Sequence, residues 1–554
     1  MINNPQVSYS GLTIVVDDKS RFDTTQLISG TAGSYFDNCL LTEPQYGVFR
    51  ANCEIRTLAE CKTLPFRPYT TALLLLGEES LKWAKPGVTL GEQRGSPFMM
   101  DSKVCVASYI PQDAFDRRDY FKDEEGDDDE DSAEEDVKST HGKTRRKNWK
   151  FWLREDVKKA VRLCKNGLVI DEPTIHLWPT ADSVVELLGS VRNGTVYFDI
   201  ETDALLQMTC FGFSFNGKDV YVVPMLQTYL NPRQYYYDDT DTARILRALC
   251  VCLCGNNVVI HNSSFDLFVL IWRYHLPIHA RVFDTMLVTS RLYADIEKSL
   301  GHCVSLYTDL PYHKNEGVFE PRTLADTETL YRYNAKDVHA MSLIKRGMEE
   351  KAVKLKAVDS INQVNSMVMP YLVATLQGMA VDWSKLDAMV TANDRKKFQI
   401  SRMLSILTGK PDFNPNSHQQ VGKYLYDEIG FERPKKDPTN EKTLLSLLLY
   451  RDVAVIHCVL EYRGLTKQSG KLKFLHWGGL YHSGYDVATG VSDVKAGFTT
   501  SWKLAGASTM RLSSSKVMSR TGKKPRTYFG GWGDNAQNFE KELRKVIVPA
   551  DYVS

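Results

Sequence analysis

The sequence predicts a multidomain protein of the α/β and α+β classes. Its 554 residues correspond to about three or four domains of roughly 150 residues each. Residues 195–202 alternate apolar with polar side chains, as a half-buried strand does, whereas residues 331–348 read as a helix. Hydrophobic residues make up 43% of the chain, which is enough to build a core in each domain.

The middle of the chain opens with three predicted antiparallel strands. In residues 195–202 (TVYFDIET) the apolar side chains share one face, so Asp199 and Glu201 share the other. Residues 208–225 hold two β-rich runs on either side of Asn216-Gly217, a dipeptide that favours a tight hairpin turn. Two carboxylates side by side on a strand are a typical ligand pair for a divalent cation.

Two further segments add carboxylates downstream. Residues 258–274 (VVIHNSSFDLFVLIWRY) predict a short buried strand, a polar turn, and a helix whose start carries Asp266. In the helix predicted over residues 331–348, Tyr333 and Asp337 stand four residues apart and so lie on one face.

These side chains fit a site for two metal ions. Magnesium prefers hard oxygen ligands and keeps several waters, so a few convergent carboxylates leave room for a substrate phosphate. With Mg²⁺ or Mn²⁺, one ion would lower the pKa of an attacking water and the second would stabilise the leaving 3′ oxygen, while Tyr333 orients or deprotonates the water. Each motif alone also fits a solvated strand face or an incidental helix pair. The expected metal ligands are Asp199, Glu201, Asp266 and Asp337.

Together the three segments resemble the DEDD family of 3′→5′ exonucleases, in the subtype with tyrosine in the third motif. Asn262 and Phe265 match the second motif, and Phe283-Asp284-Thr285 matches the segment that follows it. The resemblance implies an RNase H-like domain over residues 186–350, a mixed sheet with helices, in which Asn262 and Phe265 contact DNA. It implies the catalytic residues Asp199, Glu201, Asp266, Tyr333 and Asp337.

Four segments follow in an order that resembles the thumb of a family-A DNA polymerase, namely residues 363–386, 413–431, 436–448 and 461–472. The resemblance implies a helical thumb that grips the duplex backbone, because helix starts present free amides to phosphate. An ordinary helix cap or surface helix is the alternative at each position. The implied DNA-binding residues are Asn416, Ser417 and Gln420 at a helix start, and Arg463 and Lys467 on a later helix.

The last segments resemble the beginning of the polymerase palm. Residues 504–519 match through Arg511 and Ser513, and residues 533–552 match through Asn535, Gln537 and Asn538. The first palm motif, the fingers and the later palm motif of that family do not follow. We therefore expect residues 351–554 to be a truncated thumb and palm that does not add nucleotides by itself, since that reaction needs palm carboxylates and a phosphate-gripping lysine. A second polypeptide would supply them.

Residues 1–165 resemble, more weakly, a family-4-like uracil-DNA glycosylase. ALLLLGEES (72–80) would form the central strand and turn of its α/β sheet. The family's Gly-Glu-Ala-Pro-Gly loop has no counterpart before Asn38, and Ile110-Pro111-Gln112 replaces its His-Pro-Ser motif. We expect a degenerate, non-catalytic domain, because base excision needs these groups to stabilise charge.

An acidic run, Asp123 to Asp136, is followed by a basic block. Such low-complexity charge cannot bury a core, so residues 122–148 are expected to form a disordered loop. The alternative is a tethered acidic mimic of DNA. Residues 166–185 then form a linker and the start of the exonuclease domain.

Composition sets further limits. The net charge is +1, but it is lowered by the acidic run, so the remainder is basic enough to suit DNA. No apolar stretch of about 18 residues occurs, and the amino terminus lacks a signal-peptide pattern, so we expect a cytoplasmic protein. The 11 cysteines lack paired metal-binding spacing, and Cys250, Cys252 and Cys254 are expected to be core thiols.

The leading hypothesis is a DNA replication protein, the front portion of a split or truncated family-A DNA polymerase, which supplies proofreading to primer-template and single-stranded 3′ ends. Its arrangement is similar to those of large bacteriophages, in which case it would act in the host cytoplasm. One alternative is a stand-alone exonuclease that trims DNA or RNA. The other is a non-catalytic scaffold for replication partners.

Overall fold

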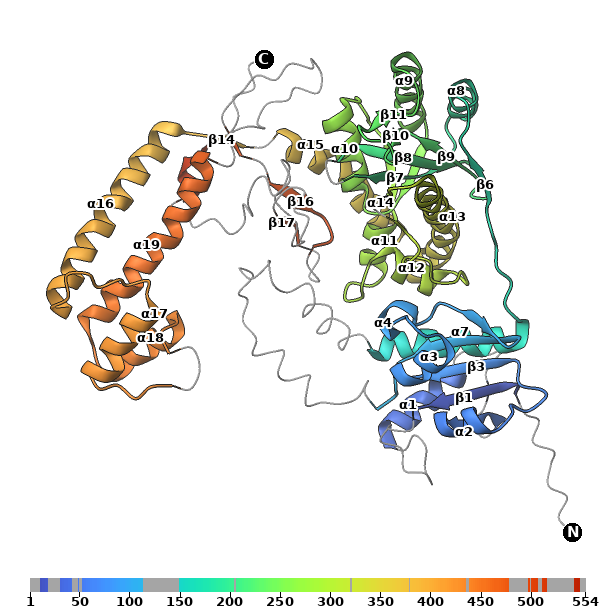
Figure 1. Ribbon diagram of the computed structural model, residues 1–554, viewed down its shortest axis with the longest axis horizontal. Helices are drawn as coiled ribbons and strands as arrows, with labels where there is room; N and C mark the ends of the chain where they lie inside the picture. The colour runs from blue at the N-terminus through green and yellow to red at the C-terminus, as the bar shows by residue number, and fades with distance from the viewer. Residues whose placement is uncertain are drawn as a thin grey trace, which may run out of the picture. The chain divides into compact units, whose positions relative to one another are not determined.

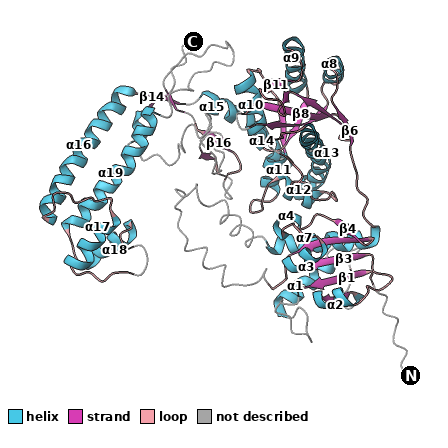
Figure 2. Cartoon of the chain, viewed as in Figure 1, coloured by secondary structure: helices cyan, strands magenta, loops and turns pink. Residues whose placement is uncertain are grey.

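The computed structural model describes residues 10–17, 30–41, 48, 52–112, 149–203, 206–318, 321–377, 379–434, 438–477, 497–498, 500–506, 511–515 and 543–548. The chain has the predicted mixed α/β architecture (Figures 1 and 2). By its internal contacts it divides into two compact units, the first mainly residues 1–370 and the second mainly residues 371–503. The charged loop predicted at 122–148 lies outside the described residues.

The amino-terminal part of the first unit is built on a five-stranded sheet in the order β2-β1-β3-β5-β4. Only β4 is antiparallel to its neighbour, and β3 is the central strand, as predicted for ALLLL. The strands are β1 (Leu12–Val16), β2 (Glu54–Thr57), β3 (Ala72–Leu76), β4 (Phe98–Met100) and β5 (Lys103–Ser108). The helices are α1 (Gly30–Leu41), α2 (Leu58–Thr63), α3 (Glu78–Ala84), α4 (Leu90–Gln93) and α7 (Trp149–Asn166).

Both faces of this sheet are covered. Leu74 belongs to one buried cluster with α1 and α7, whereas its neighbours Leu73 and Leu75 belong to a second cluster with α3. Strands buried on both faces are expected to be continuously apolar, which accounts for the run of four leucines in β3. Gly77 follows this strand with φ of +97°, and a Cβ there would lie 2.4 Å from Oδ2 of Asp17. The glycine therefore lets Asp17 cap α3 by accepting the Ser80 backbone N–H.

The second sheet of this unit is mixed and has the order β13-β12-β7-β8-β9-β6. Strands β7, β8 and β9 are antiparallel neighbours, and Gly217 takes φ of +74° in the turn after β8, so the predicted hairpin is confirmed. The strands are β6 (Thr174–Leu177), β7 (Thr195–Thr202), β8 (Met208–Ser214), β9 (Asp219–Pro224), β12 (Asn257–Ile260) and β13 (Arg281–Asp284), with a separate pair β10 (Leu226–Gln227) and β11 (Gln234–Tyr235). The helices are α8 (Ala181–Ser190), α9 (Asp239–Gly255), α10 (Ser263–Tyr274), α11 (Thr285–Leu292), α12 (Leu300–Tyr307), α13 (Leu324–Leu355) and α14 (Val358–Ser366).

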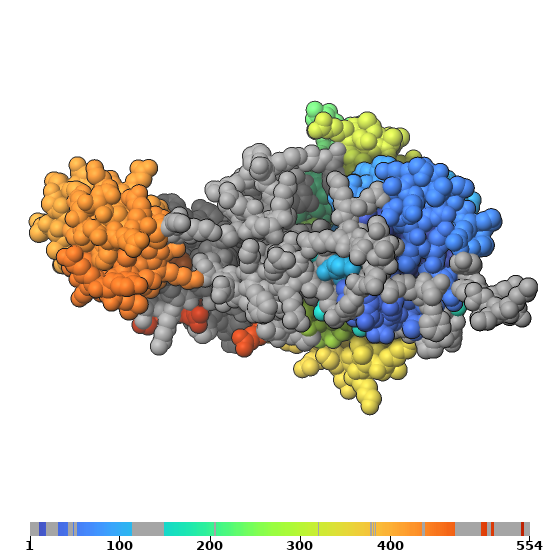
Figure 3. All heavy atoms as spheres, turned by 90° about the horizontal axis from the view of Figure 1, so that it is seen from below, coloured from blue at the N-terminus to red at the C-terminus, as the bar shows by residue number. Residues whose placement is uncertain are grey.

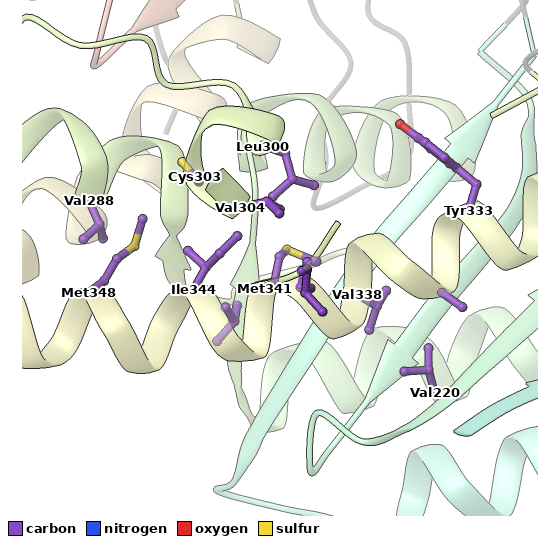
Figure 4. Close-up of a cluster of buried hydrophobic side chains, with 14 of the residues drawn as sticks. Val220, Val288, Leu300, Cys303, Val304, Tyr333, Val338, Met341, Ile344 and Met348 are labelled. Atoms are coloured by element: carbon purple, nitrogen blue, oxygen red, sulfur yellow. The ribbon is translucent and has the colours of Figure 1, made fainter. Parts of the chain in front are cut away.

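The long helix α13 packs against this sheet and supplies much of its core. Val338, Met341, Ile344 and Met348 recur at helical spacing and meet side chains of α11 and α12. Figure 4 shows Met341, Ile344 and Met348 on the side of α13 that faces Cys303 and Val304, with Tyr333 at the end of the cluster. Because that face is buried, the position of Tyr333 on it is determined by the packing of the whole helix.

A buried polar junction ties the amino-terminal part of the first unit to the end of α12 and the residue that follows it. Lys159 of α7 donates from Nζ to the backbone oxygens of Gly95 at 2.9 Å, Ser305 at 2.5 Å and Thr308 at 2.6 Å. Arg94 pairs with Asp156 at 2.8 Å and donates to Ser305 Oγ at 2.6 Å. A buried charge requires such partners, so these contacts hold residues 305–308 in place.

The second unit consists mainly of a long pair of helices with a small helical end. Helices α16 (Trp383–Thr408) and α19 (Ala454–Trp477) pack along each other, and Figure 3 shows their side chains in one closely packed lobe, coloured orange. Asn393 Nδ2 donates to Ser469 Oγ at 3.0 Å between them. The remaining helices are α15 (Val368–Gln377), α17 (His418–Gly422), the π-helix η3 (Lys423–Glu428), α18 (Glu441–Tyr450) and the 3₁₀-helix η5 (Leu543–Val546). The strands are β14 (Met379–Val381), β15 (Gly497–Phe498), β16 (Ser501–Lys503), β17 (Ser513–Ser515) and β18 (Ile547–Val548). No helix in the described ranges is both long and apolar enough to cross a membrane.

Candidate metal and active site

Strand β7 positions the first two carboxylates. Its residues alternate between half-buried and buried positions, so the predicted strand is confirmed, with Asp199 and Glu201 on the half-buried face. The β7–β8 register shifts between Glu201 and Thr202. The regular pairing of β7 with β8 is thus interrupted directly after Glu201, and interruptions such as β-bulges are frequent beside functional sites.

Asp337 of α13 completes a group of three carboxylates. One oxygen from each of Asp199, Glu201 and Asp337 lies within 4.8 Å of the others. The first two side chains are half-buried and the third is buried. Residues 138 positions apart are thus brought together because α13 packs on β7.

The electrostatics of this group favour a cation. Burial, followed by the charge of Asp337, raises the pKa of Asp199 to about 8. Asn334 Nδ2 donates to Asp199 Oδ2 at 2.7 Å and partly offsets this shift. A divalent cation that prefers oxygen ligands would neutralise the repulsion between these neighbouring carboxylates. The three carboxylates therefore fit the predicted Mg²⁺ or Mn²⁺.

Two basic residues, which the sequence did not reveal, contact Asp337. His313 Nε2 lies 2.8 Å from Oδ1 and Lys314 Nζ lies 2.5 Å from Oδ2. Burial opposes ionisation of Asp337, but Lys314 and His313 outweigh it and lower its pKa. The two residues lie in a loop more than 20 positions before Asp337, and no local pattern connects them with it.

Tyr333 lies one helical turn before Asp337 and is 4% exposed. Burial, followed by the charge of Asp337, raises its pKa well above the ordinary value. The phenol therefore keeps its proton, which suits it to orient a water by hydrogen bonding and not to deprotonate one.

Asp266 lies close to this group without being part of it. It is buried at the start of α10, and its Oδ1 accepts the backbone N–H of Ile200 at 3.1 Å. Burial and the charge of Asp199 raise its pKa well above the ordinary value. The contact ties α10 to β7, and ligation of a metal by Asp266 stays a prediction.

The turn after β12 is held by Asp284. Its carboxylate accepts from Ser263 Oγ at 2.6 Å and from the backbone N–H groups of Asn262 at 3.2 Å and Ser263 at 2.7 Å. This explains structurally why the segment Phe283-Asp284-Thr285 accompanies the second motif. Asn262 takes a left-handed φ of 61° and is exposed, whereas Phe265 is half-buried; their contacts with DNA stay predictions.

In the second unit the residues predicted to bind DNA have local structural roles. Ser417 caps α17 by accepting the Gln420 N–H at 3.3 Å, and Gln420 Oε1 accepts the Asn414 N–H at 2.7 Å. Arg463 donates from Nε to the Pro415 carbonyl at 2.8 Å, so its guanidinium holds the preceding loop. These contacts agree with the alternative of ordinary caps and internal ties.

The other predicted DNA contacts have varied surroundings. Asn416, Lys467 and Arg511 are exposed, and Ser513 is half-buried in β17. Their contacts with DNA stay predictions. The positions Asn535, Gln537 and Asn538 lie outside the described residues.

The cysteine prediction needs a partial correction. Cys252 is buried in α9, as expected, but Cys250 and Cys254 are only half-buried, and the Sγ atom of each lies 3.8 Å from the Pro277 carbonyl oxygen.

Comparison with known proteins gives partial matches. No family model matches this chain. A DNA polymerase I of Helicobacter pylori is 33% identical over 128 residues, which cover 22% of this chain and 13% of the relative. The DNA polymerase I of Pseudomonas aeruginosa is 25% identical over 361 residues, which cover 58% and 37%. That of Synechocystis is 24% identical over 251 residues, which cover 43% and 25%.

These matches relate the chain to DNA polymerase I, and it spans well under half the length of these curated relatives. Among solved structures, the "POL domain of Pol1 from M. smegmatis complex with DNA primer-template and dNTP" is similar with a TM-score of 0.43 and 15% identity. The similarity covers 61% of this chain and 54% of that chain.

Proposed function

We propose that this chain is a DNA replication or repair protein related to DNA polymerase I, and that its own activity is 3′→5′ exonuclease cleavage of DNA. The observation that carries the proposal is the convergence of Asp199, Glu201 and Asp337 within 4.8 Å on β7 and α13. The sequence similarity to DNA polymerase I supports DNA as the substrate.

The three carboxylates would hold Mg²⁺ or Mn²⁺, which when bound supplies an acidified water and stabilisation of the leaving 3′ oxygen. Asn334 fixes the orientation of Asp199 through its 2.7 Å hydrogen bond. The protonated phenol of Tyr333 orients the attacking water, and Asp266 fixes α10 against β7. The second unit would grip the duplex backbone.

The test is shortening of a 3′-recessed, mismatched primer-template by the full chain with Mg²⁺. The wild type is expected to shorten the primer, and Asp199→Ala with Glu201→Ala is expected to abolish shortening while DNA binding is retained, because backbone contacts supply affinity. Wild-type rates in the double variant would contradict the proposal. Faster shortening of RNA than of DNA would favour the stand-alone nuclease.

Tyr333 and Asp337 have separable roles in this proposal. Tyr333→Phe should slow shortening less than Asp337→Ala, because the phenol only orients the water whereas Asp337 holds the metal. A larger defect in Tyr333→Phe would reverse these roles. Nucleotide addition with a partner polypeptide that carries palm and fingers stays a prediction, tested by primer extension after the two chains are mixed.

A further inference from the structure

Lys314 lies between two of the proposed catalytic groups. Its Nζ is 2.5 Å from Asp337 Oδ2 and 4.3 Å from the centroid of the Tyr333 ring. The Lys314 side chain is 23% exposed and that of Asp337 is 4% exposed. A half-buried ammonium ion therefore touches both a proposed metal ligand and the face of the proposed water-orienting tyrosine.

This ion pair differs from the surface pairs of the same region. Lys336, the neighbour of Asp337 on α13, pairs with Glu316, but those side chains are 39% and 47% exposed. Exposed pairs of this kind contribute little. By contrast, the Lys314 pair is reinforced by His313 on the other oxygen of the same carboxylate.

The loop that carries Lys314 is anchored at its start. Thr308 accepts from buried Lys159 through its carbonyl and accepts the Leu310 N–H at 3.2 Å through Oγ1. The segment is thus anchored at residues 308–310 and again at His313, the neighbour of Lys314, which contacts Asp337.

We propose that Lys314 is a positioning residue of the nuclease site that competes with a divalent cation for Asp337 and, once displaced, binds a phosphate of the DNA strand. The proposal rests on the proposed function. An ammonium ion and a divalent cation repel each other at contact distances from one carboxylate. Since coupling between two ligands is reciprocal, the lysine weakens metal binding as much as the metal weakens the lysine's contact.

Once displaced, the lysine would have a phosphate of the bound strand as its partner. Lysine acts as a mobile point charge toward phosphate, and the carboxylate site is where a substrate phosphate would lie. Lys314 would therefore balance the charge of Asp337 before metal and DNA bind, and stabilise negative charge on the strand afterwards.

The experiment measures Mn²⁺ binding by calorimetry on the full chain without DNA, alongside the rate of primer shortening. Lys314→Met is expected to bind Mn²⁺ about 5-fold or more tightly than the wild type, the size of a typical coupling, yet to shorten DNA roughly 100-fold more slowly. Lys314→Arg keeps the charge and should stay near the wild type in Mn²⁺ affinity. Lys336→Met, which removes the neighbouring surface pair, should change neither quantity.

A purely structural lysine gives the opposite result, because its loss would loosen Asp337 and weaken Mn²⁺ binding together with activity. The proposal is overturned if Lys314→Met has the melting temperature of the wild type but binds Mn²⁺ equally or more weakly. If the methionine variant does not fold, Lys314→Gln replaces it in the same experiment. Absence of Mn²⁺ binding in the wild type, or equal binding in Asp199→Asn, overturns the proposed function as well. The two failures are therefore distinguishable.

Discussion

Asn334 of α13 donates a hydrogen bond to Asp199 of β7, with 2.7 Å between Nδ2 and Oδ2. The contact is possible because Gly212, which lies opposite Asp199 on β8, has no side chain. A Cβ at Gly212 would lie 2.2 Å from Asn334 Oδ1. One glycine thus allows α13 to approach the sheet closely enough to orient a carboxylate of the site.

Asn334→Ala is expected to lower the affinity for Mg²⁺ or Mn²⁺ by about 10- to 100-fold, the usual effect of removing a group that orients a metal ligand. Calorimetric titration of the full chain checks this. Asn362→Ala, on the exposed side of α14, is the control and should bind like the wild type. Equal affinities in all three proteins would show that the hydrogen bond does not orient Asp199.

Gly212→Ala should destabilise the first unit by about 1–3 kcal/mol, because the added methyl group forces α13 away from the sheet. The free energy of unfolding in urea measures the effect. Gly189→Ala is the matched control, since nothing lies within 4 Å of a Cβ at that position of α8; it should be neutral or stabilising by up to ~1 kcal/mol. A Gly212→Ala variant as stable as the wild type would contradict the close approach.

Metal affinity should rise with pH up to about 8. Burial raises the pKa of Asp199 to about 8, so below that pH a cation must displace a proton from this carboxyl group. Titrations with Mg²⁺ at several pH values between 6 and 9 test the dependence. In Asp199→Asn the Mg²⁺ affinity should be weak and should no longer rise with pH between 6 and 9. A wild-type Mg²⁺ affinity that does not change with pH would argue against a raised pKa of Asp199.

The contribution of His261 to the stability of the first unit should fall as the pH drops from 6.5 toward 4. Burial lowers the pKa of His261 from 6.5 to about 4, so in this window the unfolded chain binds a proton that the folded chain does not. This histidine by itself therefore makes stability rise with pH there, whereas the raised pKa values of Asp199 and Asp266 act in the opposite direction. The free energy of unfolding in urea, plotted against pH, should have a less positive slope in His261→Gln than in the wild type, and the exposed His279→Gln should keep the wild-type slope. Identical slopes in His261→Gln and the wild type would refute this.

Lys159→Met should destabilise the first unit by about 2–3 kcal/mol, because the carbonyls of Gly95, Ser305 and Thr308 lose a charged donor. Lys158→Met is the control, since that half-buried lysine pairs with Glu155 at a long 3.5 Å and should contribute less than about 1 kcal/mol. Unfolding in urea compares the two variants. Similar effects would mean that the junction does not stabilise the unit.

Local sequence patterns determined much of the first unit. The alternation in residues 195–202 predicted β7, Asn216-Gly217 predicted the turn between β8 and β9, and the spacing of Tyr333 and Asp337 predicted their common face on α13. These features depend on the period of a strand or helix and on turn chemistry, which neighbouring residues carry within a few positions.

Only the tertiary structure decided which side chains meet. The approach of Lys314 and His313 to Asp337, the support of Asp199 by Asn334, and the use of Asp266 as a backbone acceptor all join segments far apart in the chain. Such contacts depend on how α10, α13 and the loop after α12 pack on one sheet. The sequence by itself therefore determined the carboxylates that the site offers, whereas packing decided their partners and charges, because hydrogen bonds and ion pairs act through distance in space and not along the chain.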